Sequence, residues 1–143
     1  MKIFLGGTCP SDKEDFDYRK NLMKDLDIFG IEYFNPVVDE WTDDSWKEEQ
    51  RQKDDICDVH LYLITPNFKG FYSFAEVLDS TWAYKGKKKC VYGFLPTISG
   101  DKKFTEGQIK SLNAIGKLME TRGGTYMRDL KSVSDVGTYL SML

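Results

Sequence analysis

The sequence predicts a single α/β domain over residues 1–143, built on a five-stranded parallel sheet with helices on both faces. Short apolar segments alternate with longer segments whose apolar residues recur at helical spacing. Strands that alternate with helices pair in parallel, because each helix carries the chain back to the same end of the sheet. Gly or Pro residues follow the first four apolar segments, as expected where strands end. Five strands in this pattern favour the order 2-1-3-4-5, a flavodoxin-like or Rossmann-like three-layer sandwich.

Glycines mark the ends of the first strand and the first helix. The segment KIFLGG at residues 2–7 is short and apolar, and its two glycines permit a sharp turn or the close approach of a ligand. A helix is expected at about residues 15–29, with Gly30 as its end. Its apolar positions at helical spacing are Phe16, Leu22, Met23, Leu26 and Phe29.

Two strands and two helices are expected in the middle of the chain. IEYFNP, residues 31–36, is the second strand, ended by its Asn-Pro pair. An acidic segment with two tryptophans follows and ends in a helix over about residues 45–56. VHLYLIT, residues 59–65, is rich in β-branched and aromatic residues and is the third strand. The next helix is expected at about residues 74–84.

The remaining elements complete the alternation. KCVYGFLP, residues 89–96, is the fourth strand, and a helix is expected at about residues 106–121. TYM, residues 125–127, is a short fifth strand, and residues 134–143 form a closing helix.

Charge and composition limit the classes of partner and the compartment. With 20 basic and 23 acidic residues the net charge is −3, so neither nucleic acid nor an anionic membrane is an expected partner. The basic run at residues 87–89 is interpreted as a solvated loop. A signal peptide and an 18-residue apolar segment are both absent, and the cysteines Cys9, Cys57 and Cys90 do not suggest a disulfide framework. We expect a soluble, cytoplasmic protein.

The candidate site lies where the parallel strands end. In such folds ligands bind beyond the carboxyl ends of the strands, near the point where the strand order reverses. In this chain that edge is made of four loops. They are GGTCP (6–10), NPVVDEW (35–41), TPNFKGFYSFAE (65–76) and FLPT (94–97).

Several common chemistries lack their motifs at this edge. Neither GxGxxG nor GxxxxGK[ST] occurs, so no dinucleotide-binding loop or P-loop is expected. Cys9 does not begin a Cys-x5-Arg phosphatase motif, because residue 15 is Asp. A receiver domain would need acidic residues where this chain has Gly6, Gly7 and Thr65. An FMN carrier would need a Ser/Thr-rich phosphate loop after the first strand.

A metal site is not expected either. His60 is the single histidine, and it lies within the third strand between Val59 and Leu61. It is interpreted as a core or sheet histidine rather than a ligand. No cofactor is expected.

Glu76 is the carboxylate of greatest interest. Ser73 and Glu76 have the spacing of a capping box, in which each side chain satisfies a free backbone N–H at a helix start. A glutamate in a first helical turn faces the positive end of the helix dipole, and aromatic residues such as Phe71, Tyr72 and Trp41 can exclude water. Such a carboxylate can capture an anomeric carbon as a covalent glycosyl ester, while a second acid protonates the leaving group.

The segments KIFLGGT, YFNPVVDEW, DVHLYLITP, GFYSFAEVLDS and VYGFLP, in this order, resemble the nucleoside 2-deoxyribosyltransferase-like family, including its small phage and bacterial members. The resemblance covers about residues 1–96. It implies a flavodoxin-like fold, no cofactor, and transfer or hydrolysis at the N-glycosidic bond of a deoxynucleoside. It places Glu76 at the position of the nucleophile. It also implies a homo-oligomer, a dimer or larger. Family enzymes often complete the pocket with a neighbouring subunit's C-terminal segment, and whether RGGTYMRDL serves in this way here is left open.

The chain departs from the family pattern at two positions. Where family enzymes have a tyrosine that orients the nucleophile, this chain has Phe4, and Tyr72 is the candidate replacement for its hydroxyl. Where they have an aspartate shortly before the nucleophile, it has Gly70. The acid that handles the base is left open among three aspartates, Asp39, Asp54 and Asp58, of which Asp58 is expected to be a turn or cap residue.

The expected catalytic residues are therefore Glu76, Asp39 and Tyr72. Substrate contacts are expected from six residues: Gly6, Gly7, Thr8, Asn35, Trp41 and Ser73. Trp41 could stack on the base, and Asn35 has turn formation as its alternative. The alternatives to deoxyribosyl transfer are hydrolysis of a nucleoside 5′-monophosphate and a catalytically silent nucleotide-binding module.

Overall fold

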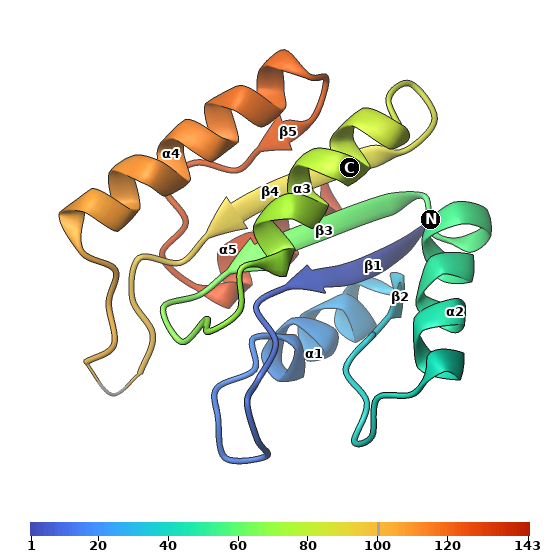
Figure 1. The fold of residues 1–143 in the computed structure, drawn as a ribbon, viewed down its shortest axis with the longest axis horizontal. Coiled ribbons are helices and arrows are strands. Elements are labelled where there is room, and N and C mark those ends of the chain that lie inside the picture. The colour runs from blue at the N-terminus through green and yellow to red at the C-terminus, as the bar shows by residue number, and fades with distance from the viewer. Residues whose placement is uncertain (100) are drawn as a thin grey trace.

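A computed structural model, which describes residues 1–99 and 101–143, has the predicted parallel sheet at its centre (Figure 1). The strands lie in the order β2-β1-β3-β4-β5, and all four neighbouring pairs are parallel. Their bounds are β1 Lys2–Gly7, β2 Glu32–Phe34, β3 Val59–Ile64, β4 Lys89–Phe94 and β5 Thr125–Tyr126. The predicted fold class is confirmed.

Helices cover both faces of the sheet. The helices α3 and α4 lie in front of the sheet in Figure 1, while α1 and α5 pack together behind it and α2 lies beside its β1–β2 side. Their bounds are α1 Arg19–Phe29, α2 Asp43–Arg51, α3 Tyr72–Ala83, α4 Glu106–Thr121 and α5 Val133–Ser141. A π-helix, η1 Gln52–Ile56, continues α2. Within the described residues, no helix is long and apolar enough to span a bilayer.

Alternating side chains of the central strands fill two cores. Side chains along a strand point to opposite faces, so a strand covered on both faces is apolar throughout. Leu61 and Leu63 of β3 pack with Leu22 and Leu26 of α1 on one face. Tyr62 of β3 packs on the other face in the core formed with α3 and α4. All five residues are fully buried.

The first helix begins later than predicted. The structure starts α1 at Arg19 rather than near Asp15. Asp12 accepts the backbone N–H groups of Glu14 and Asp15, each at 2.9 Å, and Asp15 accepts that of Ser11 at 2.9 Å. These carboxylates compete with the helix for backbone donors and hold the segment as a loop. Gly30 ends α1 with φ 67°, as predicted.

The predicted capping box at Ser73 and Glu76 is wrong. The helix α3 begins at Tyr72 after Phe71, and no side chain caps it. Ser73 therefore lies inside the first turn, where its hydroxyl donates to the carbonyl of Gly7 at 3.0 Å. The carboxylate of Glu76 lies one turn further along and is free to contact other residues.

Candidate active site

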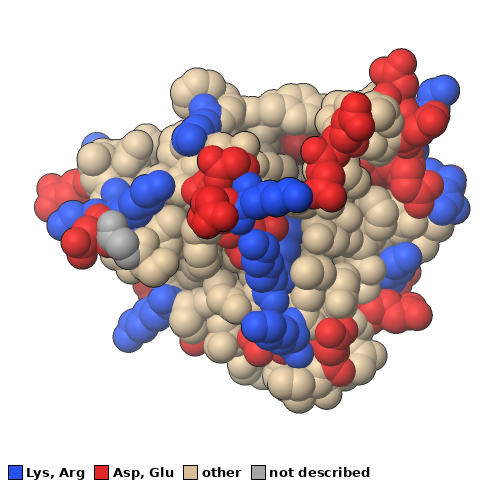
Figure 2. All heavy atoms as spheres, turned by 90° about the horizontal axis from the view of Figure 1, so that it is seen from below, with Lys and Arg blue, Asp and Glu red and all other residues tan. Residues whose placement is uncertain are grey.

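A cavity of about 400 Å³ opens at the carboxyl ends of β1 and β3 and along the start of α3. It lies at the edge where the strand order reverses, as predicted for this topology. Among the residues that line it are Gly6, Gly7, Thr8, Trp41, Trp46, Glu49, Phe68, Lys69, Tyr72, Ser73 and Glu76. Figure 2 shows one face of the molecule, on which a band of basic side chains is flanked by acidic ones.

A buried lysine joins two carboxylates at the wall of the cavity. The Lys53 ammonium makes an ion pair with Glu76 of α3 and lies 3.3 Å from Oε1 of Glu49. The exposed fractions of the side chains are 5% for Lys53, 13% for Glu49 and 15% for Glu76. Glu49 and Glu76 both line the cavity.

The π-helix η1 positions Lys53. The Cys57 N–H donates to the carbonyl of Gln52 at 2.7 Å, five residues back along the chain. A π-turn inside a helix often marks a functional site. Nε2 of His60 lies 3.1 Å from the carbonyl oxygen of Lys53, within hydrogen-bond distance. The backbone of Lys53 is thus tied to strand β3.

Burial and ion pairing shift the titration of these groups. Burial alone lowers the pKa of the Lys53 ammonium, but its pairs with Glu76 and Glu49 outweigh this and raise that pKa above its ordinary value. Burial raises the pKa of Glu49, and the nearby Glu76 charge adds to this, although Lys53 opposes it. Glu49 therefore keeps its proton to higher pH than an ordinary glutamate does.

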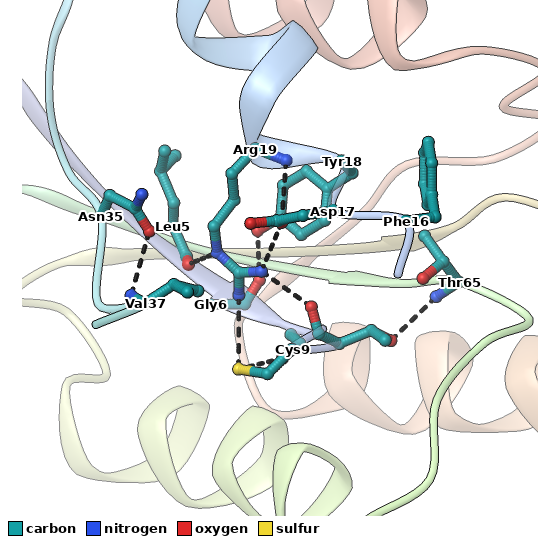
Figure 3. A network of polar contacts seen from close by, with 12 residues as sticks. Leu5, Gly6, Cys9, Phe16, Asp17, Tyr18, Arg19, Asn35, Val37 and Thr65 are labelled. Carbon is teal, nitrogen blue, oxygen red and sulfur yellow. Dashed lines mark hydrogen bonds and ion pairs between the residues drawn. The ribbon is translucent and has the colours of Figure 1, made fainter. Parts of the chain in front are cut away.

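Arg19 fixes the loop that follows β1 (Figure 3). Its side chain is completely buried, and Nε donates to the carbonyl of Leu5 at 2.7 Å. Nη1 donates to the carbonyl of Thr8 at 2.7 Å and to Oδ1 of Asp17 at 3.0 Å. The Tyr18 hydroxyl adds a hydrogen bond to the carbonyl of Gly6. This network holds the cavity wall in one conformation.

The three expected contacts at the end of β1 line the cavity and also have structural roles. Gly7 has φ 106°, and a Cβ there would lie 2.1 Å from the carbonyl oxygen of Leu63. A Cβ on Gly6 would lie 2.8 Å from the ring of Tyr62. The Thr8 hydroxyl accepts the Thr65 N–H at 3.0 Å. Close packing of β1 on β3 therefore requires small residues here.

The structure brings some of the other predicted residues to the cavity and leaves others outside. Trp41 and Tyr72 lie at its mouth with exposed fractions of 57% and 70%. Asn35 does not line it, and its Oδ1 accepts the Val37 N–H at 3.0 Å in a turn. Asp39 is exposed and also lies outside the lining.

The remaining aspartates are occupied elsewhere. Asp54 accepts the hydroxyl of Tyr84, and Asp58 accepts the Lys2 N–H at 2.9 Å at the opposite end of the sheet. Neither lines the cavity. The second carboxylate of the site is Glu49, which sequence reasoning missed together with Lys53 and Arg19.

His60 and Cys9 have environments that agree with the sequence reading. His60 is completely buried in β3, as predicted, and burial lowers its pKa to about 4. Desolvation raises the pKa of the Cys9 thiol, which disfavours a thiolate nucleophile. In the part of the chain that the structure describes, no group of three or more His, Cys, Asp or Glu residues is placed to hold a metal ion.

Comparison with known proteins gives one match. The family described as nucleoside 2-deoxyribosyltransferase like matches residues 1–92, which contain β1 to β3, α3 and all the residues that line the cavity. No curated protein and no solved structure matches the chain. The match covers well over half of the chain and includes the two acidic residues that face the cavity. The protein belongs to the nucleoside 2-deoxyribosyltransferase-like family.

Proposed function

We propose that this protein cleaves the N-glycosidic bond of a deoxynucleoside and transfers the deoxyribosyl group between bases. One observation carries the proposal: Glu76 and a second carboxylate, Glu49, face the same cavity and share the buried Lys53. A covalent glycosyl transfer needs one carboxylate as nucleophile and one as acid and base. The family supports a nucleoside as the substrate class.

In the first half-reaction Glu76 attacks the anomeric carbon of the sugar. A bond forms between this carbon and a Glu76 oxygen, while the bond to the base nitrogen breaks and its electron pair stays on the base. Glu49 donates a proton to the leaving base and becomes a carboxylate. The raised pKa of Glu49 supports this role, because the protonated acid must be present at working pH.

In the second half-reaction an acceptor base attacks the same carbon and releases Glu76. The nitrogen of the acceptor loses a proton, which returns to Glu49. If water attacks instead, the outcome is hydrolysis. The sugar keeps its anomeric configuration, because it is inverted twice.

The cavity also offers apolar surfaces suited to a flat base. Trp41, Trp46 and Phe68 contribute to its lining beside the acidic pair. Aromatic rings gain most from offset stacking or edge contacts at short range. A base held between these rings would be shielded from water while its glycosidic nitrogen faces Glu49.

Base exchange tests the proposal directly. The protein is incubated with a deoxynucleoside and a different free base, and the products are separated by chromatography. New deoxynucleoside is expected from the wild type, and Glu76→Gln should abolish it. The control is Glu14→Gln, an exposed glutamate in the loop before α1. Absence of both exchange and base release in the wild type would contradict the proposal.

A second candidate is hydrolysis of a deoxynucleoside 5′-monophosphate. Lys69 lines the cavity next to the start of α3, where backbone N–H groups face outward from the first helical turn. A phosphate could bind there. Release of base from the monophosphate without any acceptor base would favour this reaction over transfer. A rise in melting temperature with nucleotide and no turnover would instead favour a silent binding module.

A further inference from the structure

We infer that Lys53 is a positioning residue whose ammonium orients Glu76 for attack and couples the charge of Glu76 to the proton on Glu49. This inference rests on the proposed function. Lys53 forms no bond to substrate and keeps its own proton throughout. It acts through the two carboxylates that it contacts.

Lys53 lies beside the ring of Phe4. The family resemblance leads one to expect a tyrosine hydroxyl near the nucleophile, and a phenyl ring cannot donate a hydrogen bond. The Lys53 Nζ lies 4.8 Å from the centroid of the Phe4 ring and contacts the Glu76 carboxylate. The ammonium thus supplies the donor that Phe4 lacks, and the ring face holds the cation in place.

The backbone around Lys53 is held by a π-turn and by a hydrogen bond from His60. In a regular α-helix each N–H bonds to the carbonyl four residues back. Here the Cys57 N–H bonds instead to the carbonyl of Gln52, five residues back. The side chain of His60 also hydrogen-bonds to the Lys53 carbonyl. This bond ties the backbone of Lys53 to the buried strand β3. A surface lysine needs no such support.

The charge next to Lys53 changes during the proposed reaction. When Glu76 becomes an ester it loses its negative charge, and Lys53 is left opposite Glu49. The Glu76 charge is one of the causes that raise the pKa of Glu49. Its loss lowers that pKa, so Glu49 releases its proton at the moment the leaving base requires it.

Other groups that face the three residues leave this coupling intact. Arg19 of α1 is paired with Asp17, and burial raises the pKa values of Cys9 after β1 and of Tyr62 on β3, so both stay neutral. His60, also on β3, is neutral because burial lowers its pKa to about 4. The charges that change near Glu49 are therefore those of Glu76 and the substrate.

Two variants and one matched control test the role in catalysis. Lys53→Met removes the charge and keeps the length of the side chain, whereas Lys53→Arg keeps the charge. We expect Lys53→Met to lower kcat about 100-fold, with KM changed by less than about threefold, and Lys53→Arg to recover part of kcat. Lys47→Met, which replaces an exposed lysine of the preceding helix α2, should match the wild type. A Lys53→Met enzyme with wild-type kcat would overturn the inference.

Carbon-13 NMR of the glutamate carboxyl groups tests the coupling without any turnover. Glu76→Gln should lower the titration midpoint of Glu49, and Lys53→Met should raise it. An unchanged Glu49 midpoint in Glu76→Gln would overturn the coupling, even if Lys53→Met failed to fold. If the variants show these shifts but the wild type neither exchanges nor hydrolyses any substrate, the proposed function is refuted and the coupling stands.

Discussion

The Glu49 carboxylate lies 3.3 Å from the Lys53 ammonium, one turn further along the chain, where α2 passes into the π-helix η1. The two side chains are four residues apart, the spacing of an ordinary surface ion pair on a helix. Here both are nearly buried, and Glu76 from α3 completes the group. Because Glu49 and Lys53 are nearly buried and Glu49 lines the cavity, changes at this pair should alter activity.

Replacing Glu49 should slow departure of the base. Glu49→Gln cannot donate a proton, so we expect the rate of base release to fall by about 100-fold or more. In the wild type the raised pKa of Glu49 keeps the acid form present to higher pH, and the rate should fall as pH rises through that pKa. The alkaline fall should be missing from the residual activity of Glu49→Gln.

Glu48→Gln is the matched control for this change. Glu48 is the preceding residue, does not line the cavity and pairs with Arg51 at 2.8 Å on the surface. Its replacement should leave both the rate and the pH profile unchanged. Equal loss in Glu48→Gln and Glu49→Gln would show that the effect comes from helix stability rather than proton transfer.

Sequence patterns were sufficient to predict the fold and to place Glu76 at the edge of the sheet where the cavity opens, but not to identify the residues around it. Strands β1, β3 and β4 are apolar runs bounded by turn residues, and their order follows from the alternation with helices. Lys53 could not be recognised, because its role depends on contact with Glu76, 23 residues away, and on a π-turn without a sequence signature. Asp39 was the predicted catalytic acid because it follows β2, but its side chain is exposed and does not line the cavity.

Replacing Arg19 should destabilise the whole domain. Arg19→Met would leave the buried Asp17 carboxylate unpaired and two backbone carbonyls without their donor. Breaking a buried ion pair by removing one partner costs about 3–5 kcal/mol. Urea unfolding should show this loss as a lower midpoint. Lys20→Met, an exposed neighbour, should leave the midpoint unchanged, and the double variant Asp17→Asn, Arg19→Met should recover part of the loss.

A substitution at Gly7 should be far more harmful than one at an open glycine. In Gly7→Ala the new Cβ meets the Leu63 carbonyl at 2.1 Å, and the residue has φ 106°, which alanine strongly disfavours. We expect a loss of more than about 3 kcal/mol in unfolding free energy, or no soluble protein. Gly107→Ala in the first turn of α4 should be neutral or stabilising. Similar melting temperatures for the two variants would contradict the packing of β1 on β3.

The buried His60 should make the domain less stable in acid. Its pKa is lowered to about 4 in the folded state, while the unfolded chain has the ordinary value near 6.5. The unfolded state therefore binds the proton more tightly, and the stability contributed by neutral His60 is present above about pH 6.5 and is lost as pH falls towards 4. The full effect is roughly 3 kcal/mol. Urea midpoints measured between pH 7 and pH 4 should fall accordingly.

The variant His60→Gln separates this effect from the general loss of carboxylate charge in acid. Glutamine keeps an N–H donor that can reach the Lys53 carbonyl but does not titrate, so its stability should fall less between pH 7 and pH 4 than that of the wild type. Parallel pH curves for the two proteins would mean that His60 does not titrate differently in the folded and unfolded states.

Removing Trp41 should weaken substrate binding without slowing the chemical step. Its exposed ring lines the mouth of the cavity, and an aromatic contact with a flat base is worth about 1 kcal/mol. Trp41→Ala should therefore raise KM about fivefold and leave kcat nearly unchanged. The control Trp82→Ala removes an exposed tryptophan of α3 that lies outside the cavity and contacts Arg122. A fall in kcat with constant KM in Trp41→Ala would mean that the ring acts in the transition state rather than in binding the base.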